Sequence, residues 1–138
     1  MDTLYRTKAT ATGGRNGHVE SADGALNVDV RVPKEMGGPA GTNLNPETLF
    51  AAGYAACFDS ALAHVARTEK LQTGTTKVTA EVGIGKLEDG GFGLAVKLEV
   101  EVPGLDKAEA EELVRKAHQV CPYSNATRGN IEVELVVK

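Results

Sequence analysis

The chain has 138 residues, a length that fits one domain spanning residues 1–138 around a single hydrophobic core. Its 41% hydrophobic and 25% charged residues are typical of a globular protein and exclude a disordered or fibrous one. The formal net charge of −4 argues against nucleic acid as a partner, because binding to the phosphate backbone needs clustered Lys and Arg.

The first residues of the chain lack the apolar core of a secretory signal, and no run of 18 apolar residues predicts a membrane span. We therefore expect a cytoplasmic protein with no membrane partner. A reducing cytoplasm seldom maintains structural disulfides. Two cysteines in that compartment are more often redox partners, metal ligands or plain apolar residues.

The N-terminal part of the chain contains two short segments that are candidates for strands, residues 4–10 and 26–32. The glycine-rich residues 37–41 indicate a surface loop. A helix is expected from about Pro46 to Lys70, with Asn45 as its N-cap. Its many small residues predict close packing on several faces, because an isolated helix of this kind buries too little to be stable.

Alternating apolar residues predict strands at residues 78–84 and 94–102, joined by a hairpin turn at residues 89–91. Residues 131–137 alternate in the same way and predict a strand at the C-terminus.

A second helix is expected from Lys107 to Val120, with Asp106 as its N-cap and Pro122 ending it. The resulting order of strands, helix, hairpin, helix and strand predicts an α+β fold with largely antiparallel sheets.

The two cysteines are the leading candidates for chemistry. Cys57 lies in the middle of the first predicted helix among small apolar residues, and Cys121 lies at the end of the second. Two rigid elements can aim both sulfurs into the space between them, and if the sulfurs meet, one can attack a substrate while the other resolves the product. The alternatives are inert core cysteines or a structural disulfide.

A nucleophilic cysteine must be a thiolate at neutral pH, and apolar surroundings oppose its ionisation, so a nearby cation is required. Arginine suits this role, because it stays charged and offers a planar fork of donors. Arg15 is the best candidate, because its flanking glycines let the backbone turn tightly and approach a partner. The alternative for Arg15 is an exposed residue of a glycine-rich turn. Glu47 is a candidate carboxylate for that fork, and the alternative for Glu47 is an interaction with the helix dipole.

Distance along the first helix suggests how such a site is completed. Cys57 follows Glu47 by ten positions, which is about 15 Å of helical rise and too far for direct contact. We therefore hypothesise that Glu47 or Arg15 comes from the second subunit of a dimer.

Two histidines leave a metal site open as an alternative. His64 is seven positions after Cys57 on one helix, and His118 is three positions before Cys121. Two Cys and two His are a ligand set that zinc accepts, although this spacing is not that of a common zinc module.

Four segments of the chain resemble a known family. They are ATGGR at residues 11–15, NPETLFAAGYAACF at residues 45–58, VGIG at residues 82–85 and VCPYSNATRGNI at residues 120–131. They resemble the organic hydroperoxide resistance proteins, the Ohr branch of the OsmC/Ohr family, over nearly the full chain. The long motif around Cys121 is specific and favours this branch over the OsmC branch.

The resemblance implies an intertwined homodimer in which antiparallel sheets wrap long central helices, and a thiol-dependent peroxidase acting on organic hydroperoxides. It implies that Cys57 is the peroxidatic thiol, Cys121 the resolving thiol, and Arg15 and Glu47 the activating pair. It further implies no bound cofactor and recycling by an external dithiol of the lipoyl type, either dihydrolipoamide or a lipoylated protein.

A preference for bulky alkyl or fatty-acid hydroperoxides requires an apolar pocket. Four apolar residues are candidates for its lining, with ordinary core packing as the alternative for each: Met36, Leu49, Phe50 and Phe58.

Overall fold

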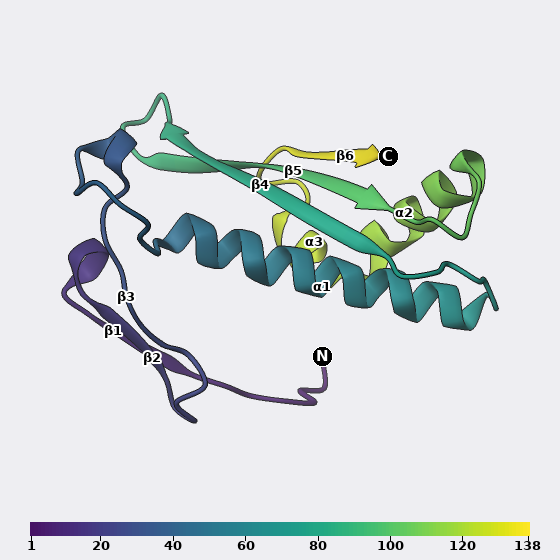
Figure 1. Cartoon of the computed structure of the whole chain (residues 1–138), viewed down its shortest axis with the longest axis horizontal. Coiled ribbons are helices and arrows are strands. Elements are labelled where there is room, and N and C mark those ends of the chain that lie inside the picture. The colour runs from purple at the N-terminus through teal and green to yellow at the C-terminus, as the bar shows by residue number, and fades with distance from the viewer. The chain divides into compact units, whose positions relative to one another are not determined.

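The computed structural model describes all residues 1–138, which form two compact units, Met1–Leu49 and Phe50–Lys138. Figure 1 labels the helices and strands along the chain.

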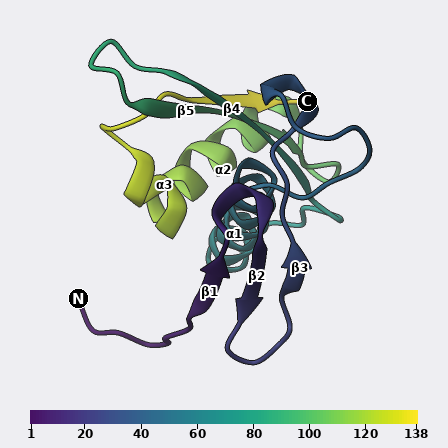
Figure 2. The same ribbon diagram turned by 90° about the vertical axis from the view of Figure 1, so that its left-hand side faces the viewer.

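The first unit is built on a small antiparallel sheet. Its strands lie in the order β1-β2-β3 and run side by side in Figure 2; their bounds are β1 (Ala9–Thr12), β2 (His18–Ser21) and β3 (Asn27–Asp29). The predicted segment at residues 4–10 overlaps only the start of β1, and β3 lies inside the predicted segment at residues 26–32. The strand β2 was not predicted, because four residues are too few for an alternating pattern to be distinctive.

The long helix α1 (Pro46–Thr68) matches the predicted one. Asn45 caps it, accepting a hydrogen bond at Oδ1 from the backbone N–H of Thr48 at 2.8 Å. By length and composition alone this helix is apolar enough to cross a membrane. Three of its apolar side chains, Tyr54, Phe58 and Leu62, are fully buried in the core of the second unit.

The second unit packs helices on one face of a sheet, as both views show (Figures 1 and 2). The sheet has the order β4-β5-β6, with bounds β4 (Lys77–Lys86), β5 (Phe92–Glu101) and β6 (Val133–Val137). The helices that follow β5 are α2 (Lys107–Val120) and α3 (Pro122–Thr127). The predicted α+β class is confirmed.

The strands β4 and β5 pair antiparallel, whereas β5 and β6 pair parallel. The parallel pair is possible because the chain crosses back through α2 and α3 before it enters β6, and parallel neighbours need a long connection of this kind. The predicted hairpin turn joins β4 to β5, where Leu87 donates its backbone N–H to the carbonyl of Gly91 at 2.8 Å. Gly90 takes a left-handed φ of 93° there, which glycine adopts without strain.

The core of the second unit lies between the sheet and the helices. Alternate residues of β5 point into it, and Leu98 and Val100 are completely buried. Leu113 and Ala117 of α2 meet them from the helical side. Burying a side chain of this size contributes about 1.5–3 kcal/mol. This packing holds α1 and α2 against the same sheet and so sets the position of the residues that they carry.

Candidate active site

The second unit brings the two cysteines together. Both are free thiols, and their sulfur atoms lie 3.6 Å apart, with Cys121 Sγ oriented to donate to Cys57 Sγ. A disulfide bond is about 2.05 Å long. The two sulfurs are therefore in non-bonded contact, and a disulfide would bring them closer by about 1.5 Å.

Cys121 sits at the junction of two helices and is completely buried. Its backbone N–H closes the end of α2 by bonding to the carbonyl of Ala117 at 2.9 Å. Its sulfur then begins α3, accepting the backbone N–H of Ser124 at 3.5 Å. Pro122 suits the first position of α3, because that position needs no N–H donor. Sequence reasoning placed Pro122 correctly at the end of α2 and missed the six-residue helix that it begins.

The environment of Cys57 disfavours its charged form. Burial raises the pKa of the Cys57 thiol, and the neighbouring Cys121 acts in the same direction, while the backbone N–H of Tyr123 lowers it in part. A thiolate at neutral pH at this position needs a further positive charge.

The first unit contains a bidentate ion pair. Arg15 Nη1 donates to Glu47 Oε2 at 2.7 Å, and Arg15 Nη2 donates to Glu47 Oε1 at 2.6 Å. The hydrogen bond from Arg15 lowers the pKa of Glu47 and, reciprocally, raises the pKa of Arg15. Arg15 and Glu47 of one chain form this pair, so one subunit contributes both residues to any site that uses them.

Arg15 is held by its local backbone. It lies in a short 3₁₀ turn, Gly14–Asn16, between glycines. A side chain at Gly17 would place its Cβ 1.7 Å from the carbonyl oxygen of Thr12, so only glycine fits there. The close approach of Gly17 to Thr12 therefore constrains the backbone next to the turn that carries Arg15.

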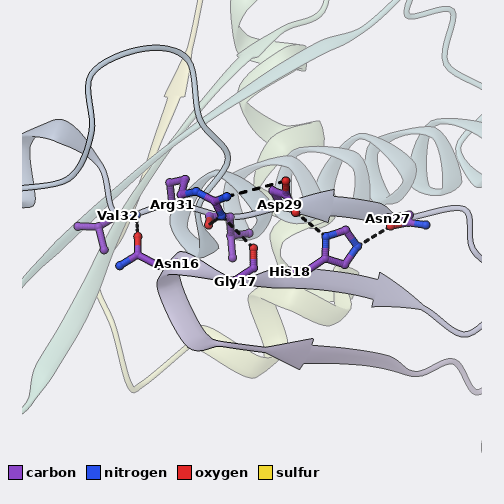
Figure 3. A network of polar contacts seen from close by, with 8 residues as sticks. Asn16, Gly17, His18, Asn27, Asp29, Arg31 and Val32 are labelled. Atoms are coloured by element: carbon purple, nitrogen blue, oxygen red, sulfur yellow. Dashed lines mark hydrogen bonds and ion pairs between the residues drawn. The ribbon is translucent and has the colours of Figure 1, made fainter.

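A polar network in the first unit fastens the end of this turn (Figure 3). Asn16 Oδ1 accepts the backbone N–H of Val32 at 3.3 Å, and Arg31 Nη1 donates to the carbonyl of Gly17 at 3.1 Å. His18 bridges Asp29 and Asn27 through its two ring nitrogens, at 2.7 and 2.5 Å. The segment that follows Arg15 is therefore tied to residues 27–32.

An apolar cavity of about 820 Å³ opens in the second unit between the β4–β5 hairpin, α3 and the segment that leads into β6. Phe50 and Tyr123 line it together with Phe92 and Ile131. Gly53 makes room for Tyr123, because a Cβ at Gly53 would lie 2.8 Å from the Tyr123 hydroxyl. The volume lies within the range of about 300–1,000 Å³ that small-molecule sites occupy.

The four residues predicted to line a substrate pocket occupy different environments. Phe50 lines the cavity just described. Phe58 has no exposed surface and belongs to the core, outside that lining. Met36 and Leu49 belong to the first unit, where Met36 is 44% exposed and Leu49 is half-buried.

The two histidines considered as zinc ligands are engaged elsewhere or exposed. His118 Nδ1 is hydrogen-bonded to Ser124 Oγ at 2.8 Å, and His64 is exposed on α1. The chain contains no group of three or more His, Cys, Asp or Glu side chains arranged to hold a metal ion.

Sequence reasoning also missed a buried hydroxyl cluster next to Cys121. Tyr54 of α1 bonds through its hydroxyl to Ser124 at 2.8 Å and to Thr127 at 3.1 Å. Ser124 and Thr127 lie inside the motif at residues 120–131, and their separation of three positions, which places two hydroxyls on one face of a helix, was the available signal.

Comparison with known proteins identifies the family. The family model described as OsmC-like protein matches residues 38–136. The organic hydroperoxide resistance protein of Xanthomonas axonopodis pv. citri is 56% identical over 97% of this chain and 94% of its own length. OhrB of Bacillus subtilis is 48% identical over 98% of both chains.

Solved structures agree with this placement. An organic hydroperoxide resistance protein from Elizabethkingia anophelis superposes with a TM-score of 0.96 and 62% identity, over 100% of this chain and 99% of that one. The chain therefore belongs to the OsmC family, in the branch of the organic hydroperoxide resistance proteins.

Proposed function

We propose that the protein is a thiol-dependent peroxidase that reduces organic hydroperoxides, alkyl or fatty-acid, to alcohols. The observation that carries this proposal is the 3.6 Å contact between two free sulfurs, those of Cys57 and Cys121. The names of the relatives, which are organic hydroperoxide resistance proteins, supply the class of substrate.

In the first step the thiolate of Cys57 attacks the distal oxygen of the hydroperoxide. The O–O bond breaks, the departing alkoxide takes up a proton and leaves as the alcohol, and Cys57 becomes a sulfenic acid.

In the second step the thiol of Cys121 attacks the sulfur of that sulfenic acid. A Cys57–Cys121 disulfide forms, the S–O bond breaks, and the thiol proton leaves with the hydroxide as water. The short sulfur–sulfur distance favours this step over further oxidation of Cys57. An external dithiol of the lipoyl type, dihydrolipoamide or a lipoylated protein, then returns both cysteines to thiols by two exchange reactions and is itself oxidised to a disulfide.

Arg15 is the proposed cation for this chemistry, with Glu47 orienting its guanidinium. A guanidinium beside Cys57 would offset the burial that raises the pKa of the thiol, and would stabilise charge on the departing alkoxide. The bidentate ion pair supports the orienting role, because it directs both terminal nitrogens of Arg15 from one fixed carboxylate.

The apolar cavity lined by Phe50 and Tyr123 is the proposed site for the organic part of the substrate. Tyr123 connects this cavity to the reactive thiol, because its side chain lines the cavity and its backbone N–H lowers the pKa of Cys57. Hydrogen peroxide has no organic group to bury there, so a preference for organic hydroperoxides follows.

We further propose that the protein works as an intertwined homodimer in the cytoplasm. In this arrangement the Arg15–Glu47 pair of one subunit completes the cysteine pair of the other.

Titration of thiols tests the proposed function. Reduced protein is mixed with cumene hydroperoxide, and free thiols are counted. The wild type is expected to lose both thiols per chain rapidly, and the Cys57→Ser variant to keep Cys121 as a thiol. The Cys121→Ser variant is expected to hold a trappable sulfenic acid at Cys57. Unchanged thiols in the wild type would refute the peroxidase, and thiols that react only after a chelator is added would favour the zinc alternative.

A further inference from the structure

A chain of hydrogen bonds among buried side chains lies next to Cys121. It runs from His118 Nδ1 to Ser124 Oγ at 2.8 Å, from Ser124 Oγ to the Tyr54 hydroxyl at 2.8 Å, and from Tyr54 to Thr127 Oγ1 at 3.1 Å. The last bond returns from Thr127 Oγ1 to the backbone carbonyl of Ser124 at 3.2 Å. These four bonds connect α1, α2 and α3.

The direction of every bond in this chain follows from counting hydrogens. A carbonyl has none, so the hydrogen of the Thr127 hydroxyl goes to Ser124 O. Tyr54 must then donate to Thr127, and Ser124 must donate to Tyr54, since each hydroxyl carries one hydrogen. The only remaining source for the first bond is His118. All four bonds therefore exist together only if Nδ1 of His118 carries a hydrogen.

The surroundings of His118 agree with a neutral ring in this tautomer. Burial lowers the pKa of His118, and the positive charge of Arg128 acts in the same direction. Arg128 also donates to the backbone carbonyl of His118 at 2.5 Å. With Nδ1 protonated, Nε2 of the neutral ring is the nitrogen that has no hydrogen.

The chain of bonds bears directly on Cys121 through Ser124. The side chain of Ser124 is anchored to α1 by Tyr54 and to α2 by His118, and its backbone N–H donates to Cys121 Sγ. Ser124 and Tyr54 are completely buried, so neither hydroxyl has water as a substitute partner. A Ser124 that lost these anchors would no longer direct its N–H at the sulfur.

We propose that His118, as the Nδ1–H tautomer, is a positioning residue for the resolving thiol, acting through Ser124, Tyr54 and Thr127 to hold Cys121 against Cys57. This inference deepens the proposed peroxidase function and rests on it. The step concerned is closure of the disulfide, in which the Cys121 thiol attacks the Cys57 sulfenic acid and water leaves. None of the four bonds involves an atom of Cys57, so we expect the attack of Cys57 on the hydroperoxide to proceed without them.

The first test is independent of activity. Nitrogen-15 labelled imidazole signals of the reduced wild-type protein identify which ring nitrogen of His118 carries hydrogen at neutral pH. A hydrogen on Nδ1 is expected, and a neutral ring protonated on Nε2 would overturn the proposal.

The second test separates the two chemical steps. His118→Phe keeps the ring shape without a donor, whereas His118→Asn places an amide N–H near the position of Nδ1. The exposed His64→Asn is the matched control. Rapid quenching with a sulfenic acid trap follows Cys57 oxidation and disulfide closure separately after mixing with cumene hydroperoxide.

His118→Phe is expected to form sulfenic acid at the wild-type rate and to close the disulfide about tenfold more slowly, the factor that corresponds to about 1.4 kcal/mol. His118→Asn should recover most of the closure rate, and Tyr54→Phe should slow closure in the same way as His118→Phe. The positioning role would be overturned if His118→Phe closed the disulfide at the wild-type rate or slowed both steps equally. It would also be overturned if His118→Asn failed to recover the rate of disulfide closure. A wild type that forms no sulfenic acid would instead refute the peroxidase itself, while the tautomer measurement would stand.

Discussion

The side chains of Arg15 and Glu47, 32 positions apart in the sequence, meet end to end, and each terminal guanidinium nitrogen donates to one carboxylate oxygen, at 2.7 and 2.6 Å. The carboxylate is well shielded, with 13% of its side chain exposed, while 33% of the Arg15 side chain remains exposed. The shielded carboxylate therefore holds the guanidinium at two points while part of the Arg15 side chain stays accessible, as an oriented cation requires.

Replacing Arg15 by alanine is expected to lower kcat/KM for cumene hydroperoxide by about 10²-fold or more, as loss of an electrostatic stabiliser does. Arg15→Lys keeps the charge and loses the bidentate fork, so it should fall between alanine and wild type. The assay follows hydroperoxide consumption with a lipoyl-type dithiol as reductant. The exposed Arg115→Ala is the control, and retention of most activity by Arg15→Ala would remove Arg15 from the mechanism.

Mixing inactive chains tests whether the site is shared between subunits. An Arg15→Ala chain and a Cys57→Ser chain are each expected to be nearly inactive alone. If the Arg15–Glu47 pair of one subunit serves the Cys57 of the other, their mixed dimer contains one complete site and activity returns. Sites built within single chains would leave the mixed dimer inactive, because neither chain then carries both residues. The measurement is activity after co-expression of differently tagged chains and purification of the mixed species.

The Arg15–Glu47 ion pair is expected to make the free energy of unfolding fall at acidic pH. The pKa of Glu47 in the folded protein lies below its ordinary value of 4.5, because of the hydrogen bond from Arg15. The ionised Glu47 therefore contributes fully to the free energy of unfolding above its ordinary pKa of 4.5. This contribution is lost as the pH falls through the lower pKa of Glu47 in the folded protein. Denaturant unfolding of wild type and Glu47→Gln at several acidic pH values should show the smaller pH dependence for Glu47→Gln. Parallel curves for the two proteins would contradict this.

If the apolar cavity binds the organic part of the substrate, a change in its lining should slow the reduction of organic hydroperoxides and not that of hydrogen peroxide. Phe50→Ala removes an aromatic wall, so kcat/KM for a fatty-acid hydroperoxide should fall, while that for hydrogen peroxide should change little. A core variant such as Leu98→Ala, which is buried away from this lining, controls for general loss of stability. An equal loss for both peroxides would assign Phe50 to packing alone.

Local signals in the sequence account for most of the elements. The caps Asn45 and Asp106 were predicted, and each accepts a backbone N–H at 2.8 Å. Alternating apolar residues at 78–84 and 94–102 located most of the long strands β4 and β5, because several successive repeats of period 2 leave little ambiguity. The short β2 and α3 were not predicted, since four to six residues carry too few repeats of any period.

Caps, turn glycines and hydrophobic period act over a few neighbouring positions. The α+β class, the long helices and strands, and the residue types available for chemistry could therefore be predicted from the sequence. Which of those residues come into contact depends on tertiary packing. Cys57 lies 64 positions from Cys121, and Tyr54 lies 70 positions from Ser124, yet each pair is in contact. Such contacts depend on how α1, α2 and α3 pack on one sheet, and that packing is set by the whole buried core rather than by any local pattern.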